Sequence, residues 1–196
     1  MTKNSLKLIS FFAIITFLFS SCEEKIYTPK PRGYYRITFP EKKYQKLDSI
    51  FPYTFEYPVY SKITRDKGEE DEPNWINITF PKLNAKIYIS YKDISNNFAE
   101  FEEDTRKLAY KHTIKADAIN EKVWENKEAK VYGILYRIKG DAASGIQFYL
   151  TDSVKHFIRA SLYFNNHPNK DSLAPSLKFI SDDINYMIKS FRWKNK

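Results

Sequence analysis

The sequence has 196 residues, a formal net charge of +8 at pH 7 and a single cysteine. Its length suits one domain with a substantial core, and a lone cysteine excludes a disulfide within the chain. The positive charge is spread over many lysines that alternate with acids, a pattern typical of a solvated surface. It also suits contact with anionic lipid head groups or envelope polymers, whereas no recognised motif indicates nucleic-acid binding.

The first 21 residues have the layout of an export signal peptide. Lys3 and Lys7 give it a positive start, and residues 8–19 are apolar apart from one serine and one threonine. This apolar run is about half of the roughly 20 residues that span a bilayer, which argues against a transmembrane anchor. Two serines then lead directly into Cys22, as in a bacterial lipobox. We predict that the signal is cleaved and Cys22 is lipidated; the alternative is an ordinary secretory signal with Cys22 as a bystander.

Lipidation would hold the protein on a membrane surface, because each buried methylene of an acyl chain contributes about 0.8 kcal/mol. Residues 23–32 are polar and include two prolines, which favour an extended course. At about 3.3 Å per residue they reach only on the order of 30 Å. We thus predict a signal peptide over residues 1–21, a lipidated N-terminus and short tether over 22–32, and a single α+β domain over 33–196.

Two strands and a loop are predicted after the tether. Residues 36–39 alternate polar and apolar side chains, and residues 53–63 repeat the pattern with Pro58 at an edge or a bulge. Residues 65–73 are the most polar stretch of the chain and form a loop. Its four consecutive carboxylates lack the spacing and the glycine of known calcium loops, so a solvated loop is favoured over a metal site.

A hairpin is predicted over residues 74–91, with turn residues at 81–84. A helix follows from about residue 97 to 115, with Ser95 or Asn96 as its cap. His112 falls on the apolar face of this helix, and we interpret it as a core-edge residue rather than a ligand.

Four strands and a second helix are predicted in the C-terminal half. Because only short turns separate the four strands, they must pair as a meander. Gly133 in the second of them indicates a bulge or close packing against a neighbour. The helix runs from about residue 173 to 191, with Asp171 or Ser172 as its cap and Pro175 in its first turn. The four predicted strands are residues 119–124, 130–139, 145–152 and 156–164.

These elements predict an α+β fold, in which two amphipathic helices pack on an antiparallel sheet of about eight strands. The order of sheet, helix, meander and helix is compatible with a PsbP-like or Mog1-like sandwich. That comparison depends on element order alone.

No arrangement of residues indicates catalysis. A GxSxG elbow is absent, and the only cysteine would be consumed by lipid. The three histidines are His112, His156 and His167; His156 is near Asp152 and Ser153, but these residues are interpreted as a turn between two strands. Sugar hydrolysis by a pair of carboxylates is not excluded, because the sequence does not give the distance between them. We predict no enzymatic activity, no cofactor and no metal site.

Two surfaces are predicted to face a partner. Residues 165–171 concentrate amides, an imidazole and a carboxylate, a composition that suits a docking surface, a metal site, or ordinary turns and caps. Near the tether, two adjacent tyrosines lie beside arginines, a combination common at protein interfaces. The candidate partner-facing residues are Arg32, Tyr34, Tyr35, Arg36, Asn165, Asn166, His167, Asn169 and Asp171. Most aromatic residues are expected in the core, whereas exposed tryptophans, among Trp75, Trp124 and Trp193, would suit stacking on sugars.

Two stretches resemble the GldD family of gliding-motility lipoproteins of the Bacteroidetes. They are TPKPRGYYRITFPEKKY at residues 28–44 and the segment over residues 164–193; the length and the leader agree as well. The resemblance implies a lipoprotein required for surface gliding and the associated type IX protein secretion, with no assigned enzymatic activity. It also implies other gliding-motility lipoproteins and type IX secretion components as partners.

We expect a lipid anchor in the outer membrane, with the domain on the periplasmic face. Glu23 and Glu24 partly resemble the acidic tags that send some Bacteroidetes lipoproteins to the cell surface, which is the alternative location. The alternative function is an envelope lipoprotein that binds peptidoglycan or polysaccharide.

Overall fold

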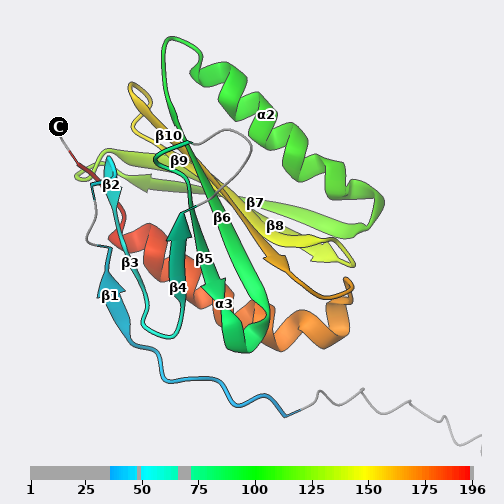
Figure 1. Ribbon diagram of the computed structural model, residues 1–196. Helices are drawn as coiled ribbons and strands as arrows, with labels where there is room; N and C mark the ends of the chain where they lie inside the picture. The colour runs from blue at the N-terminus through cyan, green and yellow to red at the C-terminus, as the bar shows by residue number, and fades with distance from the viewer. Residues whose placement is uncertain (1–35, 48–49, 66–71, 195–196) are drawn as a thin grey trace, which may run out of the picture. The chain divides into compact units, whose positions relative to one another are not determined.

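The computed structural model describes residues 36–47, 50–65 and 72–194, and within them a seven-stranded antiparallel sheet (Figure 1). Its strands are β4 (Lys62–Arg65), β5 (Ile76–Phe80), β6 (Ala85–Asp93), β7 (Ala116–Asn126), β8 (Val131–Gly140), β9 (Ser144–Thr151) and β10 (His156–Phe164). Across the sheet they lie in the order β4-β5-β6-β10-β9-β8-β7.

In the described residues, two short sheets and two helices accompany this central sheet. β1 (Tyr44–Lys46) pairs with β3 (Glu56–Pro58), and β2 (Tyr53–Thr54) pairs with β11 (Arg192–Trp193). The helices are α2 (Phe98–Tyr110) and α3 (Lys170–Ser190), and the short 3-10 turns are η1 (Pro81–Leu83) and η2 (Lys111–Ile114). The predicted α+β fold class is confirmed, with seven strands in the main sheet of the described residues instead of about eight.

The strands β7 to β10 pair in chain order, which confirms the predicted meander. Gly133 in β8 is closely packed, as predicted, since a Cβ atom there would lie 1.9 Å from the carbonyl oxygen of Tyr149 in β9. β10 also pairs with β6 and so joins the predicted hairpin of β5 and β6 to the meander. One continuous sheet results.

α3 packs across one face of this sheet (Figure 1). Side chains alternate along a strand, so Ile87 and Ile89 of β6 point to the same face. They are buried there in one cluster with Ile180, Ile184 and Ile188 of α3. These helical residues recur at a spacing of four, which gives α3 a continuous apolar stripe toward the sheet.

α2 covers part of the opposite face. Phe98 and Phe101 of α2 lie with their ring centroids 6.4 and 5.4 Å from the ring of Phe157 in β10. Tyr149 of β9 belongs to the same cluster. A groove of about 830 Å³ occupies another part of this face, where β5, β6 and β10 lie side by side.

The N-terminal strands differ from the predicted ones. Residues 36–39 form no strand; Phe39 instead stacks on Phe179 of α3, with ring centroids 4.4 Å apart. This apolar side chain is thus half-buried against a helix and does not belong to a sheet. The predicted strand over residues 53–63 is divided into β2, β3 and β4, and Pro58 is the last residue of β3.

The first helix is shorter than predicted. α2 ends at Tyr110 and the chain continues as the 3-10 turn η2, so the predicted extension to residue 115 is wrong. Neither Ser95 nor Asn96 caps α2. Its N-cap residue is Asn97, whose Oδ1 instead accepts a hydrogen bond from the backbone nitrogen of Ser95 at 2.9 Å.

The second helix begins three residues before its predicted start. Its cap is Asn169 rather than Asp171 or Ser172, because Asn169 Oδ1 accepts a hydrogen bond from the backbone nitrogen of Ser172 at 2.9 Å. Pro175 consequently lies inside the helix and not in its first turn. Its ring takes the place of an N–H that would otherwise bond the carbonyl of Asp171.

Candidate functional site

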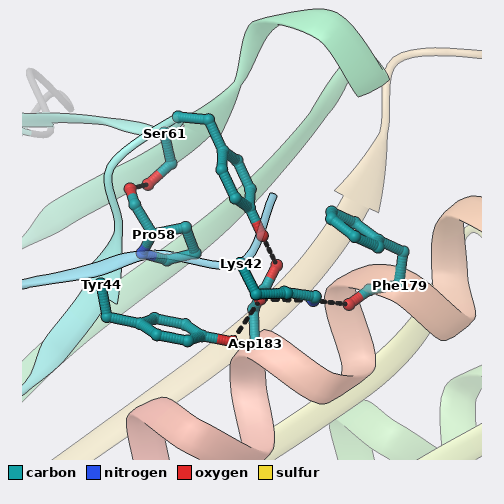
Figure 2. A network of polar contacts seen from close by, with 7 residues as sticks. Lys42, Tyr44, Pro58, Ser61, Phe179 and Asp183 are labelled. Carbon is teal, nitrogen blue, oxygen red and sulfur yellow. Dashed lines mark hydrogen bonds and ion pairs between the residues drawn. The ribbon is translucent and has the colours of Figure 1, made fainter. Parts of the chain in front are cut away.

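The buried carboxylate of Asp183 in α3 connects this helix to β1 and to the residues just before it. The side chain of Asp183 in α3 is only 2% exposed, and its Oδ1 lies 2.5 Å from Nζ of Lys42. The same carboxylate accepts hydrogen bonds from the hydroxyls of Tyr44, at 2.9 Å, and Tyr60, at 2.8 Å. Figure 2 shows the side chains of Lys42 and Tyr44 pointing toward Asp183. We call Lys42, Tyr44, Tyr60 and Asp183 the Asp183 cluster.

Aromatic contacts shield the Asp183 cluster. The ring of Tyr44 stacks on Tyr186 of α3 at 3.8 Å between centroids, and Lys42 Nζ also donates to the carbonyl of Phe179 at 2.7 Å. Burial, followed by the hydrogen bonds to Asp183, raises the pKa of both Tyr44 and Tyr60. An ion pair, hydrogen bonds and ring stacking therefore together hold Lys42 and Tyr44 against α3.

The predicted partner-facing residues near the tether are only partly covered by the structure. Arg36 is exposed. Arg32, Tyr34 and Tyr35 lie outside the described residues.

The predicted loop at residues 165–171 is tied to the turn between β5 and β6. Asn84 Nδ2 donates to the carbonyl of Asn165 at 2.9 Å and to Oδ1 of Asn166 at 2.6 Å, while the backbone nitrogen of Asn165 donates to the carbonyl of Asn84 at 2.8 Å. Asn166 and His167 are exposed. Asn165 and Asn166 therefore stabilise the contact between the loop and the turn of Asn84. The loop also presents a polar surface to solvent.

The end of this loop borders a cavity of about 620 Å³ beside the start of α3. Asn169 and Asp171 lie at its edge, and Leu173 and Leu177 contribute apolar surface. Asn169 is at the same time the cap of α3. The structure thus brings the loop and an apolar cavity together, a combination that the sequence alone did not indicate.

Asp152 and Ser153 lie in the turn between β9 and β10, as the sequence predicts, and His156 is the first residue of β10. Burial opposes ionisation of Asp152, but three backbone hydrogen bonds, the shortest at 2.8 Å from Lys155, outweigh it and lower the pKa of Asp152. The imidazole Nδ1 of His156 lies 2.7 Å from the hydroxyl of Tyr91 instead. The three residues do not form a nucleophile, base and acid arrangement.

The remaining histidines do not assemble a metal site. His112 lies in η2 and is half-buried, and burial lowers its pKa, as does the nearby Arg159. His167 is exposed. Within residues 36–47, 50–65 and 72–194, no three histidine, cysteine or acidic side chains gather closely enough to hold a metal ion.

The 830 Å³ groove on the sheet face is lined by side chains from neighbouring strands. In β6 and β10, Tyr88 is opposite Ser161 and Lys86 is opposite Tyr163. The rings of Tyr88 and Tyr163 meet edge to face at 5.8 Å, and Lys86 Nζ lies 5.1 Å from the centroid of Tyr88. We call this the sheet groove and define it by Trp75, Lys86, Tyr88, Arg159, Ser161 and Tyr163.

Sequence reasoning missed the sheet groove, although it named Trp75 among the candidates for sugar stacking. A signal was present in the alternation of Lys86, Tyr88 and Ser90, and of Arg159, Ser161 and Tyr163. Only the pairing of β6 with β10, which are far apart in the chain, places both sets on one surface.

The fold is that of an α+β domain, and the sequence that precedes it is typical of a lipoprotein leader. The particular family follows from residues 24–193, which match the family model described as gliding motility lipoprotein GldD. The chain belongs to this family, which confirms the resemblance seen in the sequence. As a member of a lipoprotein family it is anchored to a membrane by lipid, and the family description names no enzymatic activity.

No curated protein sequence matches the chain. Among solved structures, cyanobacterial PsbP from Synechocystis sp. PCC 6803 is similar, with a TM-score of 0.48 and 14% sequence identity. The match covers 79% of this chain and 94% of that chain. Of the helices in the described part of the chain, none has the length and apolar character needed to cross a membrane.

Proposed function

We propose that this protein is an outer-membrane lipoprotein, acylated at Cys22, that supports gliding motility and the associated type IX protein secretion. The single observation that carries the proposal is the family match over residues 24–193, which begins just after the predicted lipidation site. The protein acts through protein contacts and not through catalysis. Its partners are other gliding-motility lipoproteins and components of the type IX secretion machinery.

The Asp183 cluster supports a role in which the anchor and the binding surface must stay connected. A short tether keeps the domain near its membrane, and the ion pair of Lys42 with Asp183 holds the next segment on α3. The loop at residues 165–171 and the cavity beside α3 then offer a polar and an apolar surface to a partner. We place the domain on the periplasmic face of the outer membrane.

A deletion strain tests the motility role. Complementation with the wild type should restore colony spreading and the release of secreted cargo into the medium, while Cys22→Ala should restore neither although the protein is present by immunoblot. If spreading and secretion persist in the deletion strain, the proposal is wrong. If Cys22→Ala rescues fully, anchorage has no part in the mechanism.

Protease treatment of intact cells tests the location. We expect the protein to survive together with a periplasmic control protein. Degradation of the protein while that control survives would place the domain on the cell surface.

A photo-crosslinking residue at His167 tests the partner-facing surface, because this side chain is exposed in the loop. We expect a crosslinked envelope protein that is absent when the same residue replaces Val123, which is 73% exposed in the edge strand β7. Equal crosslinking at both positions, or none at either, would contradict a partner contact at the loop.

A further inference from the structure

The sheet groove carries positive charge that no carboxylate of its lining neutralises. Lys86 and Arg159 are its charged lining residues, and none of the described residues that line it is acidic. Arg159 is half-buried, and within the described part of the chain no acidic side chain pairs with it. Because a partly buried cation is costly without a counter-charge, an anionic ligand would complete the site.

The guanidinium of Arg159 is held in a fixed position. Its Nη2 donates to Oε1 of the fully buried Gln147 at 2.9 Å. Its Nε, together with Nε2 of Gln147 and Oγ of Ser161, has no hydrogen-bond partner among the described residues. Burial lowers the pKa of Arg159, although an arginine stays charged at neutral pH. Arg159, which lines the groove, is thus a cation held in place by Gln147.

Aromatic rings line the same groove. Tyr88 is 40% exposed, and Tyr163 meets it edge to face. Trp75, fixed by a hydrogen bond from its Nε1 to the carbonyl of Tyr91 at 2.8 Å, also lines the groove. A ring face is flat and apolar with a negative quadrupole, which suits the C–H face of a sugar ring, while the hydroxyls of serine and threonine suit the sugar hydroxyls.

The location of the groove disfavours an extended peptide. β5, β6 and β10 are each paired on both sides within the sheet, so their backbone groups cannot add a further strand. A ligand must instead be recognised by side chains alone. Aromatic rings, hydroxyls and a fixed guanidinium are a set that matches an acidic sugar.

We propose that the sheet groove binds a carboxylate-bearing polysaccharide, with Arg159 paired to a sugar carboxylate and with Tyr88 and Tyr163 against the sugar rings. This activity is additional to the motility role and does not depend on it. It gives the lipoprotein a second attachment, to an acidic glycan of the envelope.

The test measures binding of a galacturonate oligomer to the full mature lipoprotein in detergent by isothermal titration calorimetry. We expect binding of the free acid, and little binding of its fully methyl-esterified form, which keeps the sugars but lacks the carboxylates. Arg159→Gln should weaken binding at least about tenfold, as the loss of a charged hydrogen bond predicts. The matched control is Lys189→Gln, which removes one exposed positive charge from α3, on the other side of the sheet, and should leave the affinity unchanged.

Tyr88→Ala keeps the test decisive if Arg159→Gln fails to fold, because Tyr88 is on the surface and 40% exposed. It should weaken binding several-fold while the circular dichroism spectrum stays that of the wild type. Three results would overturn the proposal: equal affinity for the esterified oligomer, tighter binding of an oligoglutamate of the same length, or no binding of the free acid. Each of them rules out recognition of an acidic sugar in the groove.

Discussion

Nζ of Lys42 lies 2.5 Å from Oδ1 of Asp183, a residue 141 positions further along the chain. This ion pair closes the N-terminal segment of the domain onto its last helix (Figure 2). Asp183 is almost fully buried and also accepts hydrogen bonds from the hydroxyls of Tyr44 and Tyr60. The lysine and both tyrosines therefore share one carboxylate as their acceptor.

Asp183→Asn should lower the free energy of unfolding by about 2 kcal/mol, because Lys42 loses its counter-charge and at least one tyrosine hydroxyl loses a charged acceptor. Urea unfolding followed by tryptophan fluorescence measures the change. Asp182→Asn is the matched control, since its side chain is exposed and the change should stay within about 0.5 kcal/mol. Equal effects of the two substitutions would show that the Asp183 cluster does not stabilise the fold.

Stability should fall in alkaline solution. Burial, and then the charges of Glu121 and Glu102, raise the pKa of Tyr136 to about 12 from its usual value of 10.0. The folded state therefore keeps a proton that the unfolded state releases above pH 10, so this stabilisation is complete below pH 10 and is lost as the pH rises toward 12. Unfolding in urea at pH 8 to 12 measures the decline.

Tyr136→Phe isolates this effect. The hydroxyl of Tyr136 is buried and has no hydrogen-bond partner among the described residues, so its removal should leave stability at pH 7 unchanged or raise it by up to about 1 kcal/mol. The variant should also lose less stability than the wild type between pH 10 and 12. An identical decline in the two proteins would contradict the assigned cause.

Much of the C-terminal half was predictable from the sequence because turns of a few residues make consecutive strands pair with each other. The N-terminal segment was not predictable in this way. Alternation at residues 36–39 suits a strand, but a strand needs a neighbouring strand, and Phe39 instead stacks on Phe179 of α3. Local pattern cannot distinguish packing on a helix from pairing in a sheet.

The candidate sites were less predictable than the fold. Asp183 carried a readable signal, since it lies on the apolar stripe of α3 three residues after Ile180, where a carboxylate must find partners. The sequence around its partner Lys42 contained no pattern that indicated an ion pair. The sheet groove depends on the register that sets Tyr88 opposite Ser161, and no spacing within the chain encodes that pairing.

Gly133→Ala should prevent stable folding or cost about 3 kcal/mol or more. The added Cβ would lie 1.9 Å from the carbonyl oxygen of Tyr149, and this backbone atom cannot move without breaking the ladder between β8 and β9. Gly145→Ala is the matched control, because its Cβ would meet the methyl groups of Leu177 at 2.9 and 3.0 Å, which a rotation of that side chain relieves. Soluble yield and thermal unfolding compare the two, and similar melting temperatures would contradict the close packing at Gly133.

Asn169→Ala should destabilise the protein by about 1 kcal/mol, because the first turn of α3 loses the acceptor for the backbone N–H of Ser172. Asn169→Gly should cost only a few tenths of a kcal/mol, roughly what a glycine cap loses. His167→Ala serves as the control within the same loop, since this side chain is exposed and its removal should not change the unfolding midpoint in urea. If Asn169→Ala leaves the midpoint unchanged while crosslinking from the loop to a partner is lost, Asn169 acts at the interface and not as the cap of α3.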